Sequence, residues 1–172
     1  RQQAFGADPD VQGEQTLRTM LGTLSETFAD AVIAQMATRR SSDDEIVSAL
    51  SESRNVGVLM EGASEAGERR LTKALPSLIR LTAHPDSVVS LRAGSALGML
   101  AVKDPDALKA LAAMTEGPDP ERHLIAIHAL GDIGGSRALR YLNTLAIGHP
   151  DPAMRDAARL TSLRIKDQLG AD

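Results

Sequence analysis

The chain has 172 residues, 42% hydrophobic and 24% charged, which is enough for one domain that buries its own core. It has no cysteine, which excludes disulfides and cysteine-ligated metal sites, and its net charge of −4 gives no overall attraction to nucleic acid or anionic membranes. Only 2% of the residues are aromatic, so the core must consist mainly of Leu, Ala, Ile, Val and Met, a composition that favours helices.

The first residues give little structural signal. Residues 1–13 contain two glycines and a proline without periodicity, and we expect a flexible arm there. The chain begins with Arg1 without a hydrophobic signal core, and no segment approaches the roughly 20 apolar residues that cross a membrane. We therefore expect a soluble protein without membrane insertion of this chain. The sequence leaves two compartments open. The protein is either cytoplasmic or, after loss of an N-terminal targeting segment, extracytoplasmic.

Residues 14–73 are expected to form an N-terminal helical extension. Apolar residues at spacings of three and four predict a long amphipathic helix over residues 14–39, through which the chain could self-associate or dock a partner. Ser41–Glu45 is typical of a cap with an acidic first turn and predicts a second helix. Residues 54–73 are expected to hold a further helix. This part of the extension is either a degenerate repeat or a separate packing element.

From Ala74 onward the chain repeats itself, with three markers that recur every 31–33 residues in the same order. The first marker is Ala-Leu-x-x-Leu, which begins at Ala74, Ala107 and Ala138. The second is x-Pro-Asp, which begins at His84, Gly117 and His149. The third is Ala-Leu-Gly, which begins at Ala96 and Ala129. Three independent markers at nearly one period indicate a structural repeat.

Each marker has a physical role in a helix pair. Ala-Leu-x-x-Leu forms a core stripe on the first helix, and Pro-Asp ends that helix and caps the next one. Ala-Leu-Gly lies late in the second helix, where small residues permit a close approach of the neighbouring unit. We expect Leu97 and Leu130 to be buried between units and His128 to point away. One pair cannot bury its apolar faces alone, so the units must stack.

These units resemble HEAT-type repeats over about residues 74–166, particularly the short variety found in phycobilisome lyases and many bacterial proteins. The resemblance implies an all-α fold, a right-handed α-solenoid of HEAT-like helix pairs over residues 74–172. The last unit lacks Ala-Leu-Gly after Asp151, and we expect it to be a polar C-terminal cap.

The repeat carries no recognisable reaction centre, so we expect a non-catalytic protein-interaction or scaffolding module without a cofactor. Its partner would be another protein or peptide, because the net charge disfavours nucleic acid and the hydropathy disfavours membrane insertion of this chain. The resemblance implies that second helices form the concave wall, on which outward side chains make contact. The candidate partner-binding residues are Ser90, Ser95, Arg122, His128 and Arg155.

Metal and nucleotide sites are not indicated. His84 and His149 hold equivalent turn positions, which a structural role explains. His123 and His128 are five residues apart, or about 140° around a helix, which is unsuitable for a shared metal. The glycines of Gly131–Gly135 follow a helix and lack the Lys-Ser/Thr of a phosphate-binding loop.

Several alternatives stay open. Similarity to phycobilin lyases would imply a chromophore-attachment enzyme or chaperone, and some HEAT-like proteins bind DNA, although the acidic balance argues against it. Arg122, Arg155 and Arg159 lie close behind the aspartates of the Pro-Asp turns. They form either an Asp–Arg ladder between units or a shallow patch for an acidic segment.

Overall fold

The computed structural model describes residues 41–170, and the predicted arm over 1–13 and the predicted helix over 14–39 lie outside this part of the chain. The described part contains eight α-helices, one short 3₁₀ helix and no strand. The helices are α2 (Asp43–Glu52), α3 (Val56–Glu68), η1 (Thr72–Ala74), α4 (Leu75–Leu81), α5 (Ser87–Leu100), α6 (Pro105–Ala113), α7 (Pro120–Ile133), α8 (Gly135–Gly148) and α9 (Pro152–Gly170).

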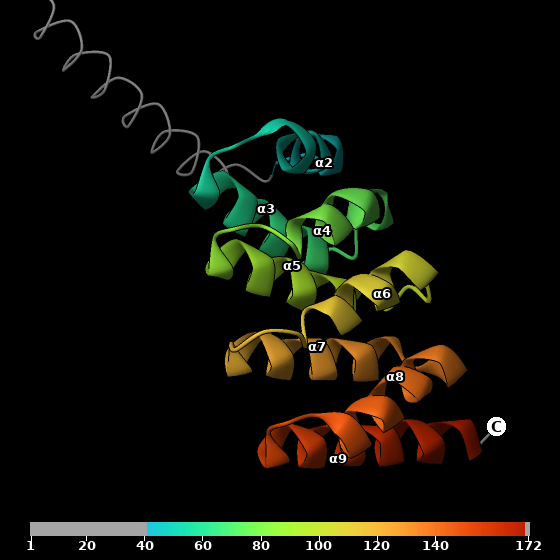
Figure 1. Ribbon diagram of the computed structural model, residues 1–172. Helices are drawn as coiled ribbons and strands as arrows, with labels where there is room; N and C mark the ends of the chain where they lie inside the picture. Colours follow the sequence, from blue (N-terminus) through green and yellow to red (C-terminus); the bar gives the residue numbers. More distant parts are fainter. Residues whose placement is uncertain (1–40, 171–172) are drawn as a thin grey trace, which may run out of the picture. The chain divides into compact units, whose positions relative to one another are not determined.

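These helices form four consecutive pairs that stack on one another (Figure 1). The first helices α2, α4, α6 and α8 form one row, and the second helices α3, α5, α7 and α9 form another. Contacts between neighbouring pairs run mainly through the second helices, whereas neighbouring first helices touch little. The expected all-α solenoid of HEAT-like pairs is confirmed.

The Pro-Asp turns end the first helices and cap the second ones, as the sequence predicts. The Asp86 carboxylate accepts hydrogen bonds from the backbone N–H groups of Val88 and Val89 at 2.9 and 3.2 Å. Asp119 caps α7 in the same way, and the Asp151 carboxylate accepts from the N–H of Ala153 at 2.8 Å. The turn therefore satisfies backbone donors that a helix start leaves unpaired.

A continuous apolar core runs between the two rows. Leu97 and Leu130 are buried and His128 is exposed, so the helical register predicted from the repeat is confirmed. The core stripe that the first marker predicts is buried at Ala74, Leu78, Ala107, Leu108, Leu111, Ala138 and Leu142. Its other two leucines, Leu75 and Leu139, are partly buried.

Small residues set the spacing of the second helices. A β-carbon built on Gly98 of α5 would lie 2.9 Å from the Cα of Ala129 in α7, and one on Gly67 of α3 would lie 3.0 Å from the Cα of Ala96. Carbon atoms normally pack at about 3.5–4.0 Å, so these positions tolerate no side chain without movement. The Ala-Leu-Gly marker thus provides both halves of the contact between units, alanine toward the preceding helix and glycine toward the next.

The pair α2–α3 occupies the same two rows as the later pairs (Figure 1). Ser42 and Glu45 form the capping box that begins α2, which confirms the cap predicted there. The helix predicted within residues 54–73 is α3, which Asn55 caps by accepting from the N–H of Val58 at 3.0 Å.

The last helix differs from the other second helices. Thr161 stands opposite Gly131, in the place that alanine takes in earlier pairs. The exposed side of α9 carries polar residues, but it also exposes Leu160, Leu163 and Leu169. The surface of the last helix is therefore mixed, in contrast to the polar cap that the sequence led us to expect.

Candidate protein-binding surfaces

The exposed sides of the second helices form one candidate surface. On α5, the exposed or half-buried Val88, Arg92, Ser95 and Met99 are spaced by four, three and four residues, which places them on one side of the helix. Neighbouring positions on α7 and α9 extend this side. We define the second-helix surface by Val88, Arg92, Ser95, Met99, Leu124, His128, Asp132, Leu160 and Arg164.

Exposed apolar side chains are concentrated on this row. Of the eight large apolar side chains that are exposed among residues 41–170, seven lie on second helices and only Ile147 lies on a first helix. Leu160 is 68% exposed and Met99 46%. Grouped exposed apolar residues with polar neighbours are typical of surfaces that bind another protein.

Polar side chains connect neighbouring helices across the second-helix surface. The Arg92 guanidinium donates to the Ser64 hydroxyl at 2.9 Å and so joins α5 to α3. Arg164 of α9 pairs with Asp132 of α7 at 3.2 Å, and both side chains are about half exposed. Such exposed pairs contribute little to the stability of the stacked helices. Their main effect is to fix the positions of these polar side chains on the surface.

The predicted binding residues divide into two groups. Ser95 and His128 lie on the second-helix surface. Ser90, in contrast, is fully buried and its hydroxyl donates to the carbonyl oxygen of Thr82 at 2.6 Å. Ser90 precedes Ser95 by five residues, about 140° around the helix, so the two side chains point in different directions.

Arg122 and Arg155 are half buried and bind backbone. The guanidinium of Arg122 donates to the carbonyl oxygen of Thr82 in the preceding unit at 3.2 Å, and Arg155 donates to those of His149 and Pro150 at 2.7 and 3.0 Å. Within residues 41–170, neither forms an ion pair with the capping aspartates, and Arg159 pairs with Asp156 in its own helix. The expected Asp–Arg ladder is therefore absent from this part of the chain.

A buried pair of histidines joins the third and fourth units, and the sequence reasoning missed it. His123 of α7 and His149 at the end of α8 are each 5% exposed, and His149 Nε2 lies 3.1 Å from His123 Nδ1. The backbone N–H of Asp151 donates to His149 Nδ1 at 3.1 Å, so Nε2 is the nitrogen that carries the proton and donates to His123. The pair is a buried structural contact, and His149 has the turn role predicted for it.

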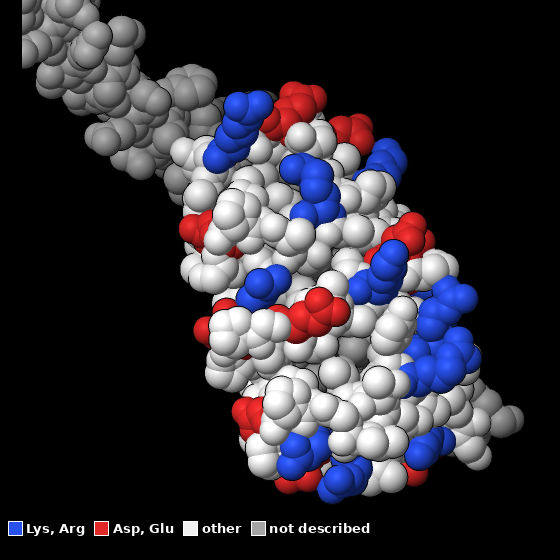
Figure 2. Space-filling model, viewed as in Figure 1, with Lys and Arg blue, Asp and Glu red and all other residues white. Residues whose placement is uncertain are grey.

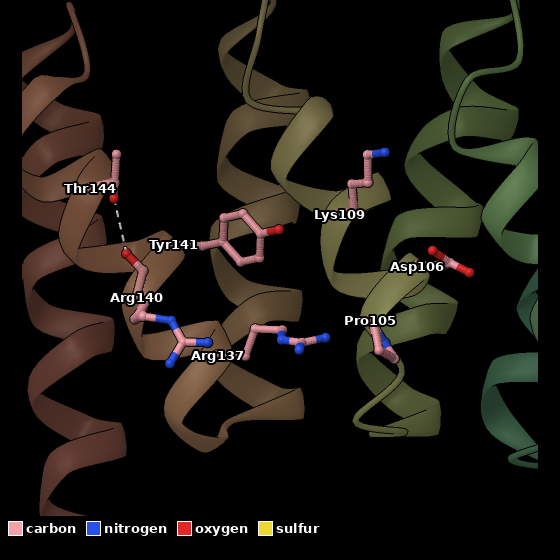
Figure 3. Close-up of a pocket in the computed structure, with 7 residues that line it drawn as sticks. All are labelled: Pro105, Asp106, Lys109, Arg137, Arg140, Tyr141 and Thr144. Carbon is pink, nitrogen blue, oxygen red and sulfur yellow. Dashed lines mark hydrogen bonds between the residues drawn. The ribbon is translucent and has the colours of Figure 1, made fainter.

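A second candidate surface lies on the opposite row. A hollow of about 450 Å³ between α6 and α8 is lined by Pro105, Asp106, Lys109, Arg137, Arg140, Tyr141 and Thr144. Arg137 and the ring of Tyr141 point from α8 toward α6 (Figure 3). In Figure 2, Lys and Arg side chains gather along the edge of the array that α6 and α8 form.

An adjoining hollow of about 570 Å³ lies between α4 and α6. It shares Asp106 and Lys109 with the first hollow. The remaining lining is Asp104, whose carboxylate caps the start of α6, and the apolar residues Leu75, Pro76, Ile79, Ala110 and Ala113. We call the two hollows together the first-helix groove.

The family model for HEAT repeats matches residues 44–130, about half of the chain, from α2 to Leu130 in α7. The chain belongs to the HEAT-repeat family. HEAT repeats generally mediate protein–protein interaction or scaffolding, and the family is typically non-catalytic. The comparison with curated proteins gave no match.

Two properties of the described residues bear on the kind of site. Residues 41–170 contain no group of three or more metal-ligating side chains arranged to hold an ion. None of their helices combines the length and the hydropathy required to cross a membrane.

Proposed function

We propose that this HEAT array is a non-catalytic adaptor that binds a partner protein on its second-helix surface. The observation that carries the proposal is that seven of the eight exposed large apolar side chains of residues 41–170 lie on second helices. Four of them lie on the second-helix surface itself, namely Val88, Met99, Leu124 and Leu160. Burial of such residues gains about 25 cal/mol per Å², and a rim of polar groups then gives specificity. Ser95 and His128 would supply polar contacts at the centre of this surface.

The test is an affinity enrichment from extract of the source organism, quantified by mass spectrometry for the intact chain and two matched variants. Leu160→Glu places a charge on the second-helix surface, and Ile147→Glu makes the same change at an 84% exposed residue of a first helix. A charge within an apolar contact should reduce recovery of a direct partner by roughly tenfold. We expect that loss for Leu160→Glu only.

Two outcomes would contradict the proposal. Equal recovery of every enriched protein by both variants would show that the second-helix surface makes no contact at Leu160. A selective loss with Ile147→Glu would move the contact to the row of first helices. Thermal unfolding of both variants serves as the folding control, since exposed substitutions normally change stability by less than about 0.5 kcal/mol.

A further inference from the structure

We propose that the first-helix groove is a separate binding site for an acidic peptide segment whose carboxylates are interspersed with apolar side chains. The site is on the row of first helices, so it goes beyond the binding proposed for the second-helix surface. Three features support it: the spacing of the first helices, the charge of one half of the groove, and the apolar lining of the other half.

The groove follows from how the units stack. Glycine and alanine hold the second helices close together, as at Gly98 and Ala129, whereas neighbouring first helices make few contacts. The first helices are therefore separated, and side chains of α6 and α8 line a hollow instead of filling it. An extended or helical segment can lie in such a hollow without disturbing the interfaces that stabilise the array.

The half between α6 and α8 has a charge opposite to that of the whole protein. Lys109, Arg137 and Arg140 line it and Asp106 is the only carboxylate in the lining, although the chain carries a net charge of −4. All three cations are exposed, and none forms an ion pair with another residue of the described part of the chain. Arginine binds carboxylates through two parallel hydrogen bonds, so Arg137 and Arg140 fit acidic side chains.

Tyr141 adds an aromatic contact to this half. It is the only tyrosine of the chain, it lies half buried beside the cations, and its hydroxyl points across the gap toward α6 (Figure 3). A ring with a polar end combines apolar contact area with a hydrogen bond at little cost in conformational entropy. The local chemistry thus suits a peptide better than an isolated anion.

The half of the groove between α4 and α6 determines which class of partner fits the site. Lys109 and Asp106 on α6 border both hollows, so a segment that crosses α6 contacts the cations on one side and Leu75 and Ile79 on the other. A nucleic acid backbone would need more cations than these three and gains nothing from an apolar lining. An acidic segment with leucine-like side chains complements both halves.

The direct test is fluorescence anisotropy with a fluorescein-labelled peptide that repeats Glu-Glu-Leu twice, measured on the full chain at about 0.15 M salt. Three probes of matched length accompany it: one with Gln for Glu, one with Ser for Leu, and a labelled oligothymidylate. We expect saturable binding of the Glu-Glu-Leu peptide and binding that is at least roughly tenfold weaker for the other three.

The variants locate the site. Arg137→Glu with Arg140→Glu should weaken peptide binding by roughly tenfold or more, and the uncharged pair Arg137→Gln with Arg140→Gln should weaken it less. Arg54→Glu with Lys166→Glu makes the same change in net charge at exposed residues outside the groove and should leave binding unchanged. Unaltered urea midpoints of the variants show that they are folded.

The outcomes separate this site from the proposed adaptor surface. Equal weakening by both charge-reversed pairs would mean general attraction and overturn the proposal, as would absence of saturable binding or tighter binding of the oligothymidylate. Equal affinity for the Ser-containing peptide would show that the apolar half of the groove does not contribute to binding. Leu160→Glu, which tests the second-helix surface, should bind the peptide as the unaltered chain does.

Discussion

The close contact between second helices predicts an unusual response to the substitution Gly98→Ala. Alanine inside a helix is normally favoured over glycine by about 1 kcal/mol. Here the new β-carbon would lie 2.9 Å from the Cα and 3.0 Å from the Cβ of Ala129, roughly 0.6 Å closer than carbon atoms normally pack. The Cα of Ala129 is part of the backbone of α7 and its Cβ is bonded directly to that Cα, so neither atom can rotate away. Helix α7 must shift, and overpacking of this kind costs about 1–3 kcal/mol.

The gain in helix propensity offsets about 1 kcal/mol of this cost, so the expected net loss in the free energy of unfolding is up to about 2 kcal/mol. Gly148→Ala is the matched control, because a β-carbon at Gly148, the last residue of α8, would meet nothing within 4 Å. Urea unfolding followed by far-UV circular dichroism should show a midpoint lowered by up to roughly 1 M for Gly98→Ala and unchanged or slightly raised for Gly148→Ala. If Gly98→Ala were as stable as the control, glycine would not set the spacing of the second helices.

Three further predictions test other parts of the array. Leu130→Ala should lower the free energy of unfolding by about 2–5 kcal/mol in urea titrations, and His128→Ala by less than about 0.5 kcal/mol; similar losses would contradict the register. His149→Ala leaves the buried imidazole of His123 without its partner and should lower the free energy of unfolding by about 1–3 kcal/mol in thermal unfolding. The control is His84→Ala at the equivalent half-exposed turn position, which should cost less. Equal losses would mean that the contact between the two histidines contributes nothing to stability. Light scattering tests whether the chain self-associates through the helix predicted over residues 14–39 or uses it to dock a partner. Self-association requires a mass above that of the monomer for the full chain and the monomer mass for a version without residues 1–40, whereas equal monomer masses would exclude it.

Much of the fold could be predicted from the sequence because the repeat depends on local chemistry. A capping aspartate, a proline in the first turn and an alanine-leucine stripe act within a few residues, and their positions are visible in one dimension. The glycine of Ala-Leu-Gly is more informative still, since its small size predicts a close neighbour, which the structure identifies as Ala129 for Gly98. The family match from residue 44 extends the array beyond the point at which the markers begin.

The binding surfaces were harder to predict from the sequence. Ser90 was expected to point outward although it is 140° from Ser95 around the helix, and aligning the units would have shown the difference. The equivalent positions in the next two units are His123 and Arg155, and in the structure all three side chains are bound to another residue of the array. A column of polar residues on an inward side is a signal of buried hydrogen bonds. This column of Ser90, His123 and Arg155 is visible in the sequence once the repeats are superposed.

The first-helix groove could not be predicted because it depends on distances between units. Arg137, Arg140 and Thr144 are spaced by three and four residues, which indicates a polar side of α8 and nothing more. That this side faces a hollow follows from the separation of α6 and α8, which the packing of other helices determines. No local pattern on either helix encodes that separation.

The two rows therefore differ in what substitutions can change. The second helices hold the stack together through glycine and alanine, so their buried side leaves little freedom, and only their exposed side can vary. The first helices touch their neighbours little, and residues such as Lys109 and Arg140 are free of packing constraints. Since the stability of a stacked array is mainly the sum of its neighbouring interfaces, charge in the groove can change without loss of the fold. Two binding sites with separate specificities can accordingly exist on one small array.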